Sequence, residues 1–191
     1  MKALVIIDAQ KGMWENPDYP PYDDVGVLDR IASLIARART AGAPILYVQH
    51  HNLDEPKHPF NPGLPGYPFH EKIAPQPGDD VTVKHKSSAF HGTDFDTKLK
   101  ARRIDHLIVT GMQSEFCVNS AIRGAYERDY KITLVSDAHS TGDTRIAKAK
   151  DIVALQNQIS HDFGEVVPAA HRPAGFRRAR RPILRYRSPA R

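Results

Sequence analysis

The chain has 191 residues, of which 40% are hydrophobic and 26% are charged, and this length and composition are typical of one globular domain. No stretch approaches the roughly 20 consecutive apolar residues that a membrane-spanning helix needs, so we expect no membrane partner. The N-terminal apolar run is too short for a secretory signal peptide. A single cysteine excludes an internal disulfide framework and is typical of a protein in the reducing cytoplasm.

The net charge of +5 comes from one end of the chain. Residues 172–191 contain eight arginines and no acidic residue, and without them 19 basic residues face 22 acidic ones. We therefore predict one domain over residues 1–171 and an Arg-rich tail without fixed structure over residues 172–191. Such a tail could bind phosphate, but we favour an extension of little consequence and do not expect nucleic acid as a partner.

In chain order, apolar runs at residues 3–7, 45–48, 81–83, 107–109, 132–135 and 166–167 predict strands. Amphipathic periodicity predicts helices at residues 24–41, 94–103, 116–129 and 145–160, with Thr93 and Asp94 as the cap of the second one. This alternation predicts a single-domain, three-layer α/β/α fold with a mostly parallel sheet of about six strands.

The stretch from residue 51 to residue 80 interrupts this alternation. It contains seven prolines with Gly63, Gly66 and Gly78 among them, so neither a helix nor a central strand can run through it. Loops of this length inside a small domain are often lids or pocket walls.

Three reactive side chains follow predicted strands. Asp8 ends the first strand, Lys84 follows the third, and Cys117 comes shortly after the fourth. The carboxyl ends of parallel strands share one edge of the sheet, so this edge could gather all three. Taken singly, each residue has a simpler interpretation, since Asp8 could cap a turn, Lys84 could be a solvated loop lysine with Lys86 as its competitor, and Cys117 could be a small core residue.

Cys117 is expected in the first turn of a helix. The free backbone N–H groups there, together with a nearby lysine, favour the thiolate. We therefore expect a lowered pKa for Cys117 and fast alkylation by iodoacetamide well below pH 8.

The sequence resembles the isochorismatase-like cysteine hydrolases, which are related to nicotinamidases. The resemblance runs in order from residue 3 to about residue 168, and any single piece of it is weak. The matching pieces are residues 4–10 (LVIIDAQ), Lys84 with 88–90 (SAF) and 92–93 (GT), 111–118 (GMQSEFCV), 121–125 (AIRGA) with Tyr130, and 135–139 (VSDAH).

The resemblance implies a catalytic set of Asp8, Lys84 and Cys117. In such a set Cys117 attacks a carbonyl, Asp8 moves the proton, and Lys84 holds the thiolate and orients Asp8. The resemblance also implies a cis peptide bond between Met112 and Gln113, which would aim backbone N–H groups at the oxyanion.

The substrate pocket and any metal are harder to predict. Gln10, Trp14 and Phe90 are the candidates for substrate binding, although both aromatic rings could be ordinary core. His50, His51 and Asp54 could gather a metal by composition, but they lack the Asp-x-His order of zinc-dependent relatives, and solvated loop histidines are the simpler interpretation. We therefore expect no metal and no cofactor, as in the metal-free, streptothricin hydrolase-like branch.

The expected function is cleavage of an amide-like C–N bond other than a peptide bond, in a small carboxamide, lactam or ureido compound. Two alternatives remain open at this point. One is vinyl-ether hydrolysis of the isochorismate type, and the other is a non-catalytic binding protein on the same fold, with the arginine tail as its working part. The resemblance also leads us to expect a homo-oligomer.

Overall fold

A computed structural model of the chain describes residues 1–17 and 19–171. The predicted Arg-rich tail at residues 172–191 lies outside this part of the chain. No helix among the described residues is both long and apolar enough to cross a membrane.

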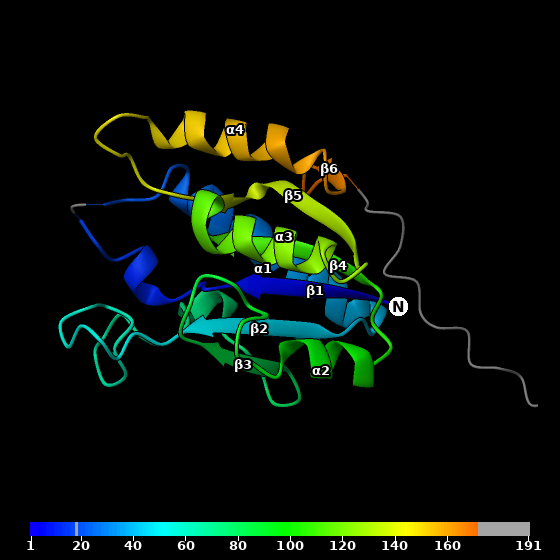
Figure 1. Cartoon of the computed structure of the whole chain (residues 1–191). Helices are drawn as coiled ribbons and strands as arrows, with labels where there is room; N and C mark the ends of the chain where they lie inside the picture. Colours follow the sequence, from blue (N-terminus) through cyan, green and yellow to red (C-terminus); the bar gives the residue numbers. More distant parts are fainter. Residues whose placement is uncertain (18, 172–191) are drawn as a thin grey trace, which may run out of the picture.

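Six strands form one sheet in which every neighbouring pair is parallel. Across the sheet the strand order is β3-β2-β1-β4-β5-β6 (Figure 1). The strands are β1 (Lys2–Ile7), β2 (Ile45–His50), β3 (Asp80–Lys84), β4 (His106–Met112), β5 (Lys131–Ser140) and β6 (Glu165–Val167). The predicted three-layer α/β architecture with about six strands is therefore confirmed.

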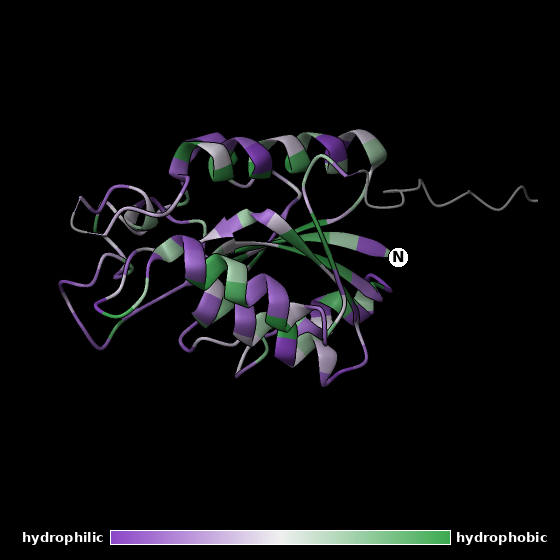
Figure 2. Cartoon of the chain, turned by 90° about the horizontal axis from the view of Figure 1, so that it is seen from above, coloured by the Kyte–Doolittle hydropathy of each residue, from purple (hydrophilic) through white to green (hydrophobic). Residues whose placement is uncertain are grey.

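Helices cover both faces of the sheet, and their apolar sides turn toward it (Figure 2). Helix α1 (Asp24–Ala41) packs on one face, and α2 (Phe95–Ala101) and α3 (Asn119–Tyr126) pack on the other. Helix α4 (Ala149–Ser160) packs against β5 and beside α3. Because both faces are covered, β1 is apolar from residue 3 to residue 7, with Ala3, Val5 and Ile7 in one core cluster and Leu4 and Ile6 in the other.

The helix boundaries agree with the sequence in one case and shift in the others. Helix α1 has the predicted bounds and ends at Gly42, which adopts a left-handed φ of 64°. Helix α4 begins four residues late because the Asp143 carboxylate accepts a hydrogen bond from the Ala149 amide and closes residues 143–148 into a turn. Before α2, the hydroxyl of Thr93 accepts from the Phe95 amide, whereas Asp94 pairs with Lys98.

The proline-rich stretch is docked on the segment that follows β1. The amides of Lys11 and Gly12 donate to the carbonyls of Pro68 and Gly66, at 2.8 and 2.9 Å. The two backbones approach so closely that a Cβ atom on Gly12 would lie 2.7 Å from Cβ of Pro59. Glycine is therefore needed at this crossing, and the loop forms a wall beside the carboxyl end of the sheet.

Candidate active site

The strand order reverses between β1 and β4, which are neighbours at the centre of the sheet. In open parallel sheets the crevice at the carboxyl ends of two such strands is the usual ligand site. Asp8 directly follows β1, and Cys117 lies on a π-helical turn (Ser114–Val118) that follows β4. The topology thus brings an acid and a thiol to the two sides of this crevice.

Lys84 joins these two residues from the end of β3, two strands away from β1. Its Nζ atom lies 2.7 Å from Oδ2 of Asp8 and 3.2 Å from Sγ of Cys117. The carbonyl of Lys86 accepts a further hydrogen bond from Nζ at 3.1 Å, and the Lys86 side chain is exposed. Lys84, rather than Lys86, is therefore the lysine that the fold brings to Asp8 and Cys117, and we call these three residues the Asp–Lys–Cys cluster.

The Asp–Lys–Cys cluster is closed to solvent except at Cys117. Asp8 and Lys84 are 0% exposed, whereas Cys117 retains 8% exposure. Oδ1 of Asp8 is also buried and accepts no hydrogen bond from a described residue. A small molecule would therefore meet Cys117 first, with a free carboxylate oxygen behind it.

Burial and mutual attraction set the charges of the cluster. Burial raises the pKa of Asp8, and the attraction of Lys84 opposes this rise without overcoming it. Burial acts to lower the pKa of Lys84, but Asp8 and Cys117 outweigh it and leave that pKa raised. An ammonium at Lys84 thus stays charged beside a carboxylate that accepts a proton more readily than an exposed one.

The expected low pKa of Cys117 is wrong. Burial, followed by the negative charge of Asp8, raises the pKa of the Cys117 thiol to about 12, and Lys84 offsets only part of this. The sequence showed the lysine and the helix start, but it did not show how closely the carboxylate would approach. Cys117 is therefore a thiol at rest, with a carboxylate nearby to take its proton.

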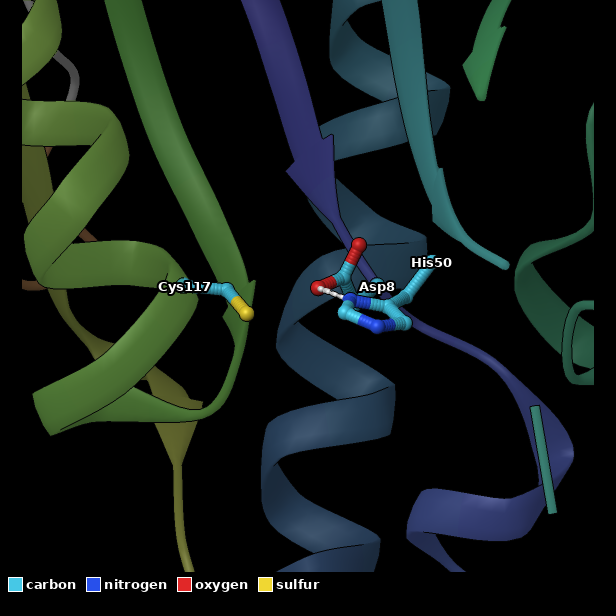
Figure 3. Close-up of side chains that lie close together, drawn as sticks. All are labelled: Asp8, His50 and Cys117. Atoms are coloured by element: carbon cyan, nitrogen blue, oxygen red, sulfur yellow. Dashed lines mark ion pairs between the residues drawn. The ribbon is translucent and has the colours of Figure 1, made fainter. Parts of the chain in front are cut away.

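His50, at the end of β2, is a site residue that the sequence interpretation assigned to a loop or a metal. Its Nδ1 atom lies 3.0 Å from Nζ of Lys84. The same atom lies 4.0 Å from Oδ2 of Asp8, as Figure 3 shows by a dashed line. The register that pairs His50 with Lys84 across β2 and β3 brings this ring to the Asp–Lys–Cys cluster. A histidine two residues past the strand predicted at residues 45–48 was the signal that could have identified it.

Among the described residues, Asp8, His50 and Cys117 form the only group whose potential metal-binding atoms converge, within 4.8 Å of one another. The Nζ atom of Lys84 contacts all three side chains at 2.7 to 3.2 Å. An ammonium therefore occupies the position from which these three ligands could be reached. The metal-binding set suggested by composition, His50 with His51 and Asp54, is not assembled. The ring of His51 packs against Tyr67 and His85 instead.

Gln10 is completely buried beside the cluster, but its amide is already engaged. Its Nε2 donates to the carbonyls of His50 and Tyr67, at 3.1 and 2.8 Å, and its Oε1 accepts from the His50 amide at 2.8 Å. These bonds tie the end of β2 to the proline-rich loop. The arrangement assigns Gln10 to positioning His50, whereas the sequence suggested contact with substrate.

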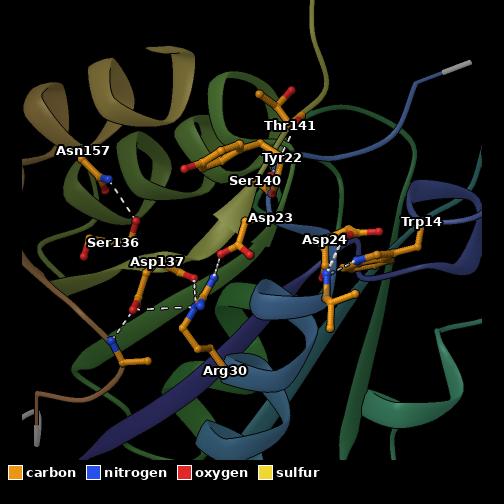
Figure 4. Close-up of polar contacts among 12 residues, drawn as sticks. Trp14, Tyr22, Asp23, Asp24, Arg30, Ser136, Asp137, Ser140, Thr141 and Asn157 are labelled. Carbon is orange, nitrogen blue, oxygen red and sulfur yellow. Dashed lines mark hydrogen bonds and ion pairs between the residues drawn. The ribbon is translucent and has the colours of Figure 1, made fainter. Parts of the chain in front are cut away.

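The two aromatic pocket candidates are also engaged elsewhere. The indole N–H of Trp14 donates to the carbonyl of Asp24 at 3.4 Å, and the ring packs edge-on against His70. The loop between Trp14 and Asp24 is held at the end of β5, where the Ser140 hydroxyl donates to the carbonyl of Tyr22 (Figure 4). The ring of Phe90 is 7% exposed and packs against Phe95 and Tyr130. Their expected role in substrate binding stays a prediction.

The turn that carries Cys117 is held from its other side by a buried polar chain. The peptide bond between Met112 and Gln113 is cis. Directly after it, the Ser114 hydroxyl lies 2.8 Å from Nδ1 of His139, whose Nε2 lies 3.0 Å from Oδ1 of Asn157. Asn157 donates its Nδ2 to the carbonyl of Ser136, so Oδ1 must accept from His139, and Nδ1 of His139 must accept from Ser114.

Comparison with known proteins gives consistent matches over this whole fold. Residues 2–170 match the isochorismatase domain. Streptothricin hydrolase of Streptomyces noursei is 35% identical over 170 residues, which are 89% of this chain but 56% of that protein. Ureidoacrylate amidohydrolase RutB of Variovorax paradoxus is 28% identical over 181 residues, covering 77% of this chain and 72% of that protein.

A solved structure shows the same architecture. An isochorismatase from Pseudomonas putida superposes with a TM-score of 0.83 at 31% sequence identity, over 88% of each chain. Together with the match over residues 2–170, this establishes that the chain belongs to the isochorismatase family of hydrolases.

Proposed function

We propose that this protein is a cysteine hydrolase that cleaves an amide-like C–N bond in a small molecule through a thioester intermediate. The observation that carries the proposal is the position of Lys84 Nζ, which lies 2.7 Å from Asp8 and 3.2 Å from Cys117 inside a buried cluster. A thiol, a carboxylate and a fixed cation are the groups that nucleophilic acyl transfer needs. The names of the streptothricin hydrolase and ureidoacrylate amidohydrolase relatives agree with this chemistry.

In the proposed reaction, Asp8 takes the thiol proton as Sγ of Cys117 attacks the carbonyl carbon of the substrate. The charge of Lys84 stabilises the negative charge that passes from the carboxylate to the sulfur. The backbone N–H groups of Gln113 and Cys117 bind the carbonyl oxygen as it becomes an oxyanion. The raised pKa of Asp8 suits a group that must accept a proton and return it.

Collapse of the tetrahedral intermediate breaks the C–N bond, and Asp8 returns its proton to the leaving amine. A water molecule then attacks the thioester, with Asp8 as its base, and releases the carboxylic acid and the thiol. Each proton that Asp8 takes is thus returned within one cycle. The mechanism uses the chain's own residues and requires no cofactor.

The test is hydrolysis of a panel of small amides by the wild type and by Cys117→Ala. Ammonia release follows the primary amides, nicotinamide included, and mass spectrometry follows a streptothricin-type lactam. We expect turnover by the wild type and a loss of roughly 1,000-fold or more in the variant, because the nucleophile is absent. Full turnover by Cys117→Ala would contradict the proposal, and inactivity of the wild type on every compound would favour vinyl-ether hydrolysis or a binding role.

The homo-oligomer expected from the family resemblance stays a prediction.

A further inference from the structure

The side chain of His50 contacts the cluster but has no part in the proposed proton transfers. Its Nδ1 atom lies 3.0 Å from Nζ of Lys84, whereas Oδ2 of Asp8 is 4.0 Å away, too far for a hydrogen bond. An ammonium group has three hydrogens and no lone pair, so Nδ1 can meet it only as an acceptor. The single proton of the neutral ring is therefore on Nε2.

The neutral form is also the one that the surroundings favour. Burial, followed by the positive charge of Lys84, lowers the pKa of His50 to about 4. Lys84 shares its three hydrogens among four neighbours, of which the neutral sulfur of Cys117 is the weakest acceptor. An Nδ1–H directed at the same ammonium would be repelled, so the contact fixes the tautomer of His50.

The Nε2–H group is left without a hydrogen-bond acceptor among the described residues, although the ring is held firmly in place. Gln10 bonds both the amide and the carbonyl of His50, and the rings of Phe60 and His58 lie 5.7 and 6.5 Å from the imidazole. The side chain is 18% exposed. In Figure 3 the second ring nitrogen of His50 points away from Asp8. This is a fixed, accessible donor beside the proposed nucleophile.

Cys117 and His50 face each other across Asp8 (Figure 3). A ring nitrogen of His50, a carboxylate oxygen of Asp8 and Sγ of Cys117 lie within 4.8 Å of one another. A substrate whose carbonyl carbon meets the sulfur, and whose leaving nitrogen receives the proton of Asp8, must extend its leaving group toward His50. The next polar atoms of that leaving group come within reach of Nε2–H.

We propose that His50 selects substrates by donating its Nε2–H to a carbonyl or carboxylate oxygen on the leaving group. This inference rests on the proposed function, and it adds the substrate class: amides whose leaving amine carries a hydrogen-bond acceptor two or three bonds from the nitrogen. His50 is then a specificity-determining residue. The proline-rich loop supports it through Phe60 and His58.

The test compares two ligands of nearly equal shape, N-acetylglycine and N-isobutylacetamide, of which only the first has the acceptor. Binding is measured in the Cys117→Ala background, so that it requires no turnover. We expect N-acetylglycine to bind at least about tenfold more tightly, as one hydrogen bond to a charged acceptor allows. His50→Leu should remove this preference, and His50→Gln, which keeps a donor of similar reach, should restore part of it.

The matched control is His51→Leu, the same substitution one residue away on a ring that packs against Tyr67 and His85, and it should keep the full preference. Nitrogen-15 NMR of the same proteins should show His50 protonated on Nε2 alone and its resonance shifted by N-acetylglycine. Equal binding of the two ligands, or a preference that survives His50→Leu, would overturn the inference. Failure of the proposed function would appear separately, as wild-type inactivity on the amide panel.

Discussion

The turn that carries Cys117 lies between two polar regions that are built differently. Toward β1 and β3 it faces the Asp–Lys–Cys cluster, in which charges are concentrated and Oδ1 of Asp8 has no partner among the described residues. Toward β5 and α4 it faces the Ser114–His139–Asn157 chain, which is neutral and joined by hydrogen bonds of 2.8 to 3.0 Å from end to end.

This difference indicates that one region supports the turn and the other carries the reactive groups. A buried polar atom without a partner is costly, and a catalytic role is one of the reasons why a fold keeps it. The satisfied chain fixes the turn, and the incomplete cluster on the other side keeps an acceptor for a reacting proton. Substitutions in the Asp–Lys–Cys cluster should therefore lower turnover, with or without a loss of stability, whereas substitutions in the Ser114–His139–Asn157 chain should mainly lower stability.

The largest effect is expected at the cation of the cluster. Lys84→Met would leave the buried carboxylate of Asp8 unpaired, so we expect a loss of about 3–5 kcal/mol in stability. Turnover should fall by about 100-fold or more, since the fixed charge near the reacting atoms is lost. Urea unfolding and amide hydrolysis measure the two losses. Lys86→Met is the matched control, because that side chain is exposed, and equal effects of both variants would contradict the assignment.

Asp8→Asn should have opposite effects on the turnover of substrate and on the alkylation of Cys117. Turnover should fall by about 10²–10⁴-fold because the general base is lost. Alkylation of Cys117 by iodoacetamide at pH 8 should instead become roughly tenfold faster or more, since removing the carboxylate lets Lys84 lower the thiol pKa. In the wild type alkylation should be slow at this pH. A wild-type enzyme that reacts faster than the variant would show that Cys117 is already a thiolate at rest.

The pH dependence of kcat/KM should report the same cluster. Asp8 must be ionised to take the proton, and burial raises its pKa above the ordinary 3.8, so activity should decline on the acid side at a pH above that value. On the alkaline side the limit is loss of the Lys84 proton, whose pKa is raised above 10.5. Rates for a neutral amide should therefore stay level up to about pH 10. A decline between pH 7 and pH 9 would contradict this charge assignment.

The smallest effect is expected on the supporting side. Ser114→Ala would leave Nδ1 of His139 buried without a donor, at a cost of about 1–3 kcal/mol in the free energy of unfolding. Ser120→Ala, on the flank of α3, provides the comparison and should cost less. If both alanine variants unfold at the same urea concentration as the wild type, the polar chain does not stabilise the turn.

The sequence predicted the architecture and the meeting of three side chains at one edge of the sheet. Short apolar runs predicted the strands, and period 3.6 predicted α1 to the residue, because both patterns follow from local geometry. The position of Asp8, Lys84 and Cys117 after strands predicted a shared edge, since parallel strands end on the same side. These inferences need only the direction and period of each element.

The tertiary structure decided what depends on distances between elements. The strand order makes β1 and β4 neighbours, and the register of β2 and β3 pairs His50 with Lys84. These two properties determined which strand ends meet. They also brought His50, which the sequence interpretation placed in a loop, to the site. Packing of the proline-rich loop also gave the side-chain amide of Gln10 a partner, the carbonyl of Tyr67. The raised pKa of Cys117 follows from burial and from the distance to Asp8, which are properties of the assembled site and of no single segment.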